Sequence, residues 1–363
     1  MISKYVYVMS DPEDKEDIDK IKEYPELFSF LTDQKNIISE FYTNKKWDKF
    51  KKQSNQFELV FTTGHTFPSL SSYSPISRSF FKHWEILHDF KEELSFLTNP
   101  KVRATFLAEG PGGFIEAFVK YRQKTDDLFG ITLISQDRCV PNWKISKTMQ
   151  EQSNIKLLHG KDKTGSLYNE ENIQEYIKEI GRGQCEYITA DGGFDFSNNF
   201  NNQEETSIRL INAEVYTAFA LQKPGGVFLL KIYDIHLDDT KKIIYNLKSN
   251  YDKLYFTKPL TSRPANSEKY ILCTGYRGYG LLNKSIRPSL SFLNELNEFN
   301  AIFIMKQIIS INKSLMSIKC NQSFNETLMV QLKRGIQWLH KYNIPIMKES
   351  LIFYKKLVKN NNI

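Results

Sequence analysis

Four charged residues stand where an enzyme built on a β-sheet could use them as acids and bases: Lys82, Asp191, Lys231 and Glu268. Asp191 and Lys231 end two apolar, strand-like runs, and Glu268 precedes a third. Open α/β sheets keep their active sites at such strand ends. A partly desolvated lysine near a second cation loses its proton more readily, so we expect Lys231 to act as a base assisted by Lys82. Taken singly, each residue also fits a surface, turn or cap position.

A glycine-rich turn, Gly110–Gly113, lies between the strand-like run Val102–Leu107 and a helix-like segment that extends to Arg122. Glycines at such a junction let the backbone turn sharply and approach a ligand closely. The pattern alone serves nucleotides, phosphates and plain packing alike. No Gly-x-Gly-x-x-Gly is present and Pro111 interrupts the loop, which argues against a dinucleotide-dependent dehydrogenase.

The elements that must position these residues alternate between strand and helix over residues 76–278. Near-continuous apolar strands separated by helices predict an α/β fold, with a mostly parallel sheet covered on both faces. We expect residues 1–75 to form an extension of unknown fold and residues 279–363 a basic helical segment. The expected strands are Val102–Leu107, Leu128–Ile134, Ile155–Leu158, Glu186–Ala190, Val227–Ile232, Lys253–Thr257 and Tyr270–Thr274, and the last two, with no helix between them, predict an antiparallel pair.

The net charge of +7 on 363 residues is unevenly distributed. Residues 280–363 hold twelve Lys and Arg against four Asp and Glu, which favours a polyanionic partner such as RNA, although lysines that merely solvate helices would look the same. The four cysteines are scattered and predict neither a metal site nor a disulfide framework. We find no signal peptide and no apolar stretch near the ~18 residues of a membrane span. An intracellular, soluble protein without membrane contact is expected.

Four motifs resemble those of the FtsJ-like ribose 2′-O-methyltransferases, and most closely their mRNA-cap branch. They cover about residues 76–276: Ser77-x-Ser-x-x-Lys82, Gly110-Pro-Gly-Gly-Phe114, Ala190-Asp-Gly-Gly-Phe194 and Thr261-Ser-Arg-Pro-Ala-Asn-Ser-Glu268. The last is the longest match and is found especially in the cap enzymes. Gly130-Ile-Thr-Leu133 also resembles the second strand of that branch.

The resemblance implies a Rossmann-like methyltransferase sheet and an enzyme that transfers a methyl group from S-adenosylmethionine to a ribose 2′-OH of RNA, with no metal. Lys82, Asp191, Lys231 and Glu268 would form the catalytic tetrad. The expected substrate is capped mRNA, and a capping or polymerase protein is a possible partner. The location would be cytoplasmic or nuclear, or a virus factory or virion for a viral protein. Residues matching cofactor positions are Ser77, Ala108, Glu109, Gly110, Pro111, Gly112, Gly113, Phe114, Asp137 and Asp162, and those matching RNA positions are Asn201, Gln203 and Asn266.

This chain departs from the family pattern at the cofactor side. Phe106 stands where an aspartate is frequent, with Glu109 as a partial replacement, and Asp137 matches the acid after the second strand only loosely. Two other functions remain open. One is methylation of ribosomal or transfer RNA, against which the Thr261–Glu268 motif argues. The other is a non-catalytic RNA-binding or polymerase-associated module, against which the intact tetrad argues.

Overall fold

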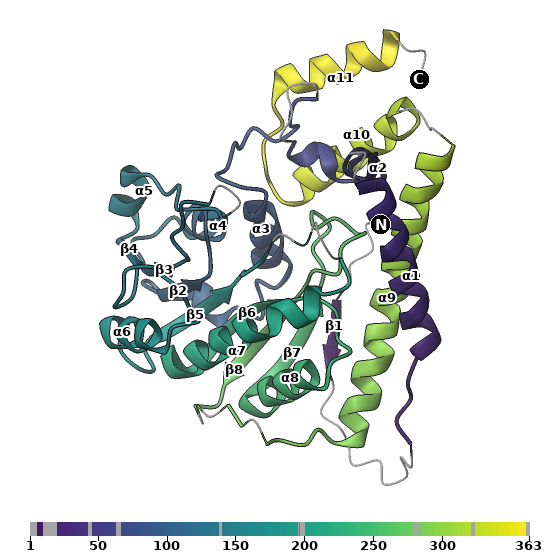
Figure 1. Ribbon diagram of the computed structural model, residues 1–363. Helices are drawn as coiled ribbons and strands as arrows, with labels where there is room; N and C mark the ends of the chain where they lie inside the picture. The colour runs from purple at the N-terminus through teal and green to yellow at the C-terminus, as the bar shows by residue number, and fades with distance from the viewer. Residues whose placement is uncertain are drawn as a thin grey trace.

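The computed structural model describes residues 6–9, 20–42, 46–62, 67–137, 140–194, 196, 200–278, 280, 282–283, 285–320 and 324–360. Its centre is an eight-stranded sheet with the strand order β1-β7-β8-β6-β5-β2-β3-β4 (Figure 1). The strands are β1 (Val6–Met9), β2 (Arg103–Leu107), β3 (Asp127–Ile131), β4 (Ile155–Leu158), β5 (Cys185–Ala190), β6 (Gln222–Ile232), β7 (Tyr251–Thr257) and β8 (Lys269–Tyr276).

The strand directions confirm the expected α/β sheet. Strands β2 to β6 pair in parallel, and β8 lies antiparallel between β6 and β7. The seven strands expected within residues 76–278 are confirmed as β2 to β8, and Val6–Met9, which lies outside that range, adds an eighth strand that pairs antiparallel with β7. The chain order reverses between β5 and β2, and open α/β sheets bind their ligands at the carboxyl ends of such a pair.

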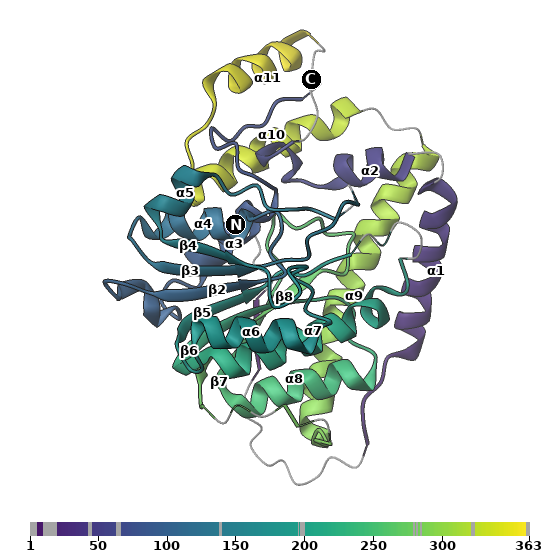
Figure 2. The same cartoon turned by 60° about the vertical axis from the view of Figure 1, so that its left-hand side comes forward.

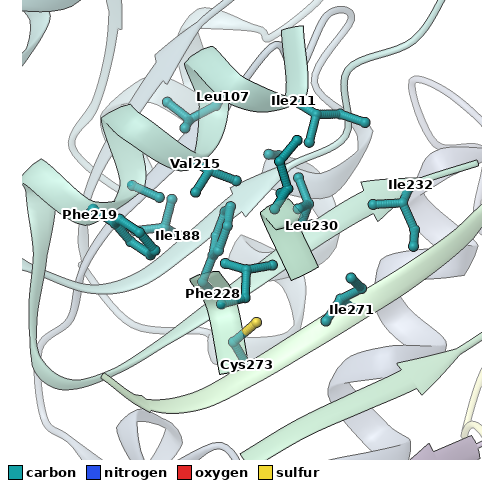
Figure 3. Close-up of a cluster of buried hydrophobic side chains, with 14 of the residues drawn as sticks. Leu107, Ile188, Ile211, Val215, Phe219, Phe228, Leu230, Ile232, Ile271 and Cys273 are labelled. Atoms are coloured by element: carbon teal, nitrogen blue, oxygen red, sulfur yellow. The ribbon is translucent and has the colours of Figure 1, made fainter. Parts of the chain in front are cut away.

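Helices cover both faces of the sheet. One face packs on α6 (Glu170–Ile180), α7 (Gln203–Leu221) and α8 (Asp238–Asn250), in a core that includes Ile211, Phe228 and Ile271 (Figure 3). The other face packs on α3 (Ser79–Asp89) and α4 (Gly113–Arg122). A short helix, α5 (Lys147–Gln152), and the turns η1 (Glu58–Val60) and η2 (Ser95–Thr98) complete this part.

The two ends of the chain pack against each other beside the sheet. Helices α1 (Pro25–Tyr42) and α2 (Lys46–Ser54) share a hydrophobic cluster with the second half of α9 (Leu290–Lys319), and α1 and α9 run side by side in both views (Figures 1 and 2). Helices α10 (Phe324–Lys341) and α11 (Lys348–Asn360) follow, and the helical C-terminal segment is thus confirmed.

Helix α9 corrects one expectation. It contains an 18-residue window apolar enough for a membrane span by length and composition, which sequence analysis did not expect. Over half of that window, 56%, is buried inside the protein. Its first half packs on the sheet through Leu296 and Phe299, and its second half packs on α1 and α2. This burial is the pattern of a core helix.

Candidate active site

Strand alternation places three of the four tetrad residues on one face of the sheet. Tyr187 of β5 and Val227 and Leu229 of β6 point into the core shared with α3 and α4. Because successive side chains point to opposite faces, Asp191 and Lys231 follow on that same side. Glu268 follows likewise from Tyr270 and Leu272 of β8. Helix α3, which packs on this face, carries Lys82.

The four side chains meet in one buried cluster. Lys82 Nζ lies 2.7 Å from Glu268 Oε1. Lys231 Nζ lies 3.1 Å from Asp191 Oδ1 and 3.9 Å from Glu268 Oε2, and it donates to the Asp191 carbonyl oxygen at 2.8 Å. The structure therefore brings together four residues that are spread over 187 positions of sequence, in alternating charge. Glu268 lies between the two ammonium groups, and Asp191 pairs with Lys231, so ion pairs hold all four side chains in place.

The pKa of Lys231 departs in the direction opposite to the one expected for a base. Burial opposes the charged form, but Asp191, Tyr233 and Glu268 outweigh burial and raise the pKa of Lys231. The physical reason is that the carboxylates of Asp191 and Glu268 lie 3.1 and 3.9 Å from Lys231 Nζ, where they stabilise its charged form. Burial likewise favours neutral Glu268, yet Lys82, Lys231 and Lys258 hold the pKa of this carboxyl well below its usual range.

The glycine-rich turn is clamped between α3 and the segment that follows β3. Gly110 N donates to Thr132 Oγ1 at 3.0 Å. A Cβ on Gly112 would lie 2.5 Å from Ile145 Cδ1, and its φ of +114° is one that side chains rarely adopt. A Cβ on Gly113 would lie 2.2 Å from Ser77 Oγ. The structure thus brings Ser77 against the turn, and both glycines are required by close approach.

Buried carboxyl groups beside the turn offer unused acceptors. Glu109 Oε1 accepts from Phe114 N at 2.6 Å, in the first turn of α4. Ala108 and Pro111 lie in the same turn as Glu109, before the start of that helix. Glu109 Oε2 and Glu214 Oε1 are buried without a hydrogen-bond partner among the described residues. Burial, with the nearby Asp191 charge, raises the pKa of Glu109. Such acceptors fit a ligand that carries hydrogen-bond donors and positive charge.

The two acids expected at the far side of the cofactor lie at the same sheet edge but are exposed. Asp162 follows β4, and its carboxylate accepts from Thr164 N, Thr164 Oγ1, Asn169 and Asn172, which lowers its pKa. Asp137 lies in the loop after β3, where its N–H donates to Ser135 Oγ. Both are therefore held in loops at the carboxyl ends of their strands, and Asp162 already uses its acceptors to close its own turn.

The three expected RNA contacts fall into two groups. Asn201 donates to Asn36 Oδ1 of α1 at 2.7 Å. Gln203 is buried and its carbonyl accepts from Ser267 Oγ at 2.5 Å, while Asn266 Oδ1 accepts from Lys258 Nζ at 2.6 Å. Gln203 and Asn266 therefore shape the loop before Glu268, and Asn201 joins that region to the N-terminal segment.

Sequence analysis missed three residues that hold the tetrad. Tyr270 Oη donates to Asp191 Oδ1 at 2.8 Å, and Ser262 Oγ donates to Glu268 Oε1 at 2.7 Å. Lys258 is buried, and its Nζ donates to the Glu268 carbonyl and to both oxygens of Asn266. Burial lowers the pKa of Lys258 to about 7. Tyr270 and Ser262 lie within the region that the motifs cover. Lys258 belongs to none of the motifs, and its only signal in the sequence is a single charge at the end of an apolar strand.

Two buried glutamates connect the loop between β7 and β8, which presents Glu268, to the rest of the molecule. Glu85, one turn after Lys82 on α3, accepts from Leu260 N at 2.7 Å and from Trp338 Nε1 of α10 at 3.0 Å. Glu58 of η1 accepts from Arg263 at 2.8 Å and lies 3.3 Å from Arg78. The loop that presents Glu268 is thus fixed from both ends of the chain.

Among the described residues, no group of three or more His, Cys, Asp or Glu could hold a metal ion. Cys185, Cys273 and Cys320 are free thiols, and Cys139 lies outside the described residues.

Comparison with known proteins places this geometry in a family. A 28% identical relative over 217 residues, 59% of this chain and 76% of its own length, is a cap-specific mRNA (nucleoside-2′-O-)-methyltransferase of Autographa californica nuclear polyhedrosis virus. An inactive cap-specific mRNA (nucleoside-2′-O-)-methyltransferase 1B of Caenorhabditis briggsae is 33% identical over 175 residues, 46% of this chain and 20% of its own length.

A putative ribosomal RNA methyltransferase of Plasmodium falciparum aligns in structure with a TM-score of 0.41 and 16% identity, over 56% of this chain and 98% of its own. The family model for FtsJ-like methyltransferases matches residues 75–276, more than half of the chain. That span holds the glycine-rich turn and the whole Lys82–Asp191–Lys231–Glu268 cluster, and the chain belongs to the FtsJ-like methyltransferase family.

Proposed function

We propose that this protein transfers a methyl group from S-adenosylmethionine to a ribose 2′-OH of capped mRNA. The observation that carries the proposal is the intact, contacting cluster of Lys82, Asp191, Lys231 and Glu268, inside the matched family region. The cap specificity of the baculovirus relative, which this chain covers over 76% of its length, supports the choice of substrate. The Thr261–Glu268 motif packs directly on the cluster through Ser262 and supports it independently.

The cofactor would lie at the glycine-rich turn. S-adenosylmethionine supplies an electrophilic methyl group on a sulfonium, and its positive charge suits the buried carboxyl groups of Glu109 and Asp191. Ser77 and the backbone of Ala108–Phe114 would hold its methionine part, with Asp137 and Asp162 on the adenosine side. The clamped backbone at Gly112 and Gly113 provides the close approach that such a ligand needs.

The chain's own residues then manage one proton. A ribose hydroxyl is a weak acid, so the developing alkoxide needs a base or strong electrostatic stabilisation. Neutral Lys231 Nζ would accept the hydroxyl proton, and Lys82 would stabilise negative charge on the oxygen. Asp191 and Glu268 orient the two amines and the hydroxyl. Because these carboxylates also raise the pKa of Lys231, its deprotonation is the step that pH controls.

Methyl transfer from labelled S-adenosylmethionine to matched capped and uncapped RNAs tests the proposal, with mapping of the modified nucleotide. We expect label on the 2′-oxygen near the cap of the capped RNA only. Lys231→Ala should abolish transfer, whereas Lys223→Ala, at the other end of β6 where Lys223 pairs with Glu186, should not. Equal labelling of uncapped structured RNA would favour ribosomal or transfer RNA. Cofactor binding without any transfer would favour the non-catalytic module.

A further inference from the structure

A basic cleft of about 390 Å³ opens on the far side of the loop that presents Glu268. Its walls come from three parts of the chain: residues 54–57 before η1, residues 258–264 after β7, and the facing surfaces of α9 and α10. Four basic residues line it: Lys258 after β7, Lys306 and Lys313 of α9, and Arg334 of α10. None of the described residues that line it is acidic.

Buried hydrogen bonds hold these walls together without a ligand. The buried amide of Gln331 on α10 donates to three carbonyl oxygens of segment 52–55, at 2.8 to 2.9 Å. Ser54 Oγ and Ser314 Oγ of α9 lie 2.7 Å apart. Arg263 ties the third wall to Glu58. Because these walls are already fixed, little conformational entropy is lost when a ligand binds, and such preorganisation is typical of a binding site.

The cleft and the tetrad share a wall. Lys258 and Ser262 line the cleft, and the same two side chains bind Glu268, through its carbonyl and its Oε1 respectively. A ligand lying in the cleft is therefore separated from the tetrad by one layer of side chains. An RNA strand that continues from the reacting nucleotide would reach the cleft by crossing this shared wall.

Two basic side chains of the cleft, Lys313 and Arg334, differ from Lys341 of the same C-terminal segment. Lys341 of α10 is paired with Asp89 at 3.1 Å and contacts Tyr342 Oη, so it is not available to a ligand in this structure. Lys313 and Arg334 make no side-chain ion pair or hydrogen bond with any described residue. Uncompensated cations around a fixed hollow are the pattern of an anion site.

We propose that this cleft binds phosphate groups of the RNA strand whose ribose is presented to the tetrad. The inference rests on the proposed function and names where its substrate is held. Phosphate suits the site because the guanidinium of Arg334 and the ammonium of Lys313 donate several charge-assisted hydrogen bonds, and no lining carboxylate opposes an anion.

The test compares Lys313→Gln/Arg334→Gln with a matched control, Lys178→Gln/Arg182→Gln. The control removes the same charge from exposed positions at the amino end of β5, opposite the site. RNA affinity is measured over a salt series, with cofactor affinity alongside. We expect the cleft variant to bind capped RNA on the order of tenfold more weakly, with a salt slope reduced by about two, one per lost phosphate contact. Cofactor affinity and both properties of the control should match wild type.

Two RNA probes distinguish the source of the phosphates. One is a cap dinucleotide, whose only phosphates form the triphosphate bridge, and the other is a 5′-hydroxyl RNA decamer, which has only backbone phosphates. Loss of affinity for either probe supports the cleft and identifies its ligand. If the cleft variant binds both probes with wild-type affinity and a wild-type salt slope, the proposal that the cleft binds phosphate is wrong. A wild-type protein that binds RNA but transfers no methyl group would instead overturn the proposed function and leave the cleft inference to its own binding data.

Discussion

Arg263 and Glu58, 205 residues apart in the sequence, form a two-point ion pair, with Nη2 2.8 Å from Oε1 and Nε 3.2 Å from Oε2. Arg78, four residues before Lys82, joins the same carboxylate at 3.3 Å. The N-terminal segment thus holds two parts of the site in register, the start of α3 and the loop before Glu268. The segment is a structural component of the site.

Replacing Glu58 with Gln should destabilise the fold by about 2 kcal/mol, because it leaves two partly buried guanidinium groups without their counter-charge. Burial opposes the charged carboxylate, but Arg78 and Arg263 prevail and lower the pKa of Glu58. Its stabilisation is therefore present above the unfolded-state pKa of about 4.3 and is lost as the pH falls through the folded-state pKa. Urea unfolding at several pH values measures this. Glu186→Gln, which breaks the more exposed pair with Lys223, should cost no more than about 1 kcal/mol.

Lys231 should set the pH dependence of methyl transfer. Its pKa is raised mainly by Asp191 acting against burial, so the amine is protonated at neutral pH and the rate should climb as the pH increases. Asp191→Asn removes the nearest negative charge and should move this rise to lower pH, while reducing the maximal rate on the order of 100-fold. Lys231→Arg should be inactive, since guanidinium does not deprotonate in proteins. An Arg variant with near wild-type turnover, or an unmoved pH profile in Asp191→Asn, would contradict this role.

Gly112 should be needed for both folding and cofactor binding. A side chain on Gly112 would block the close approach of the backbone to a ligand, and Gly112→Val adds strain from the positive φ and from contact with Ile145. We expect roughly 1–3 kcal/mol of destabilisation together with weaker cofactor binding. Gly225→Val is the matched control, because its φ is +77° but a Cβ there meets nothing within 4 Å. Calorimetry on both folded variants separates the effects. If Gly112→Val and Gly225→Val bind the cofactor with equal affinity, the glycine-rich turn is not part of the cofactor site.

Glu85 should make the protein less stable as the pH rises toward neutrality. Burial raises the pKa of this carboxyl to about 7, above the unfolded-state value of about 4.3. Between these values the folded state holds a proton that the unfolded state has lost, so the free energy of unfolding falls with pH, by up to about 3 kcal/mol. Glu85→Gln should flatten this slope. Unfolding free energies at pH 5 and pH 7 check it, and a slope that persists in the variant would assign it to other groups.

The sequence predicted the parts of the site that depend on local pattern. Strand-ending charges at Asp191 and Lys231 and a glycine turn at Gly112 are local features, and parallel strand ends necessarily meet at one edge. The antiparallel β8 was predicted for a similar reason, from the short connection to β7.

What the sequence could not predict depends on contacts between distant segments. The strand Val6–Met9 is only four residues long and has a partner in β7, some 250 positions away. The Glu58–Arg263 pair and the buried amine of Lys258 likewise leave no periodic trace. The raised pKa of Lys231 depends on distances of 3 to 4 Å that no spacing rule supplies.

The hydrogen bond from Trp338 to Glu85 makes α10 relevant to the order in which the site is assembled during synthesis. A ribosome completes every residue of the tetrad long before it reaches Trp338, so α3 and the Leu260–Glu268 loop are first made without the indole that closes their shared carboxylate. The indole reaches Glu85 only when α10 has emerged and docked. A nascent or prematurely ended chain would therefore carry all four tetrad residues and still lack the hydrogen bond from Trp338 that fixes Glu85, and with it α3 and the loop before Glu268.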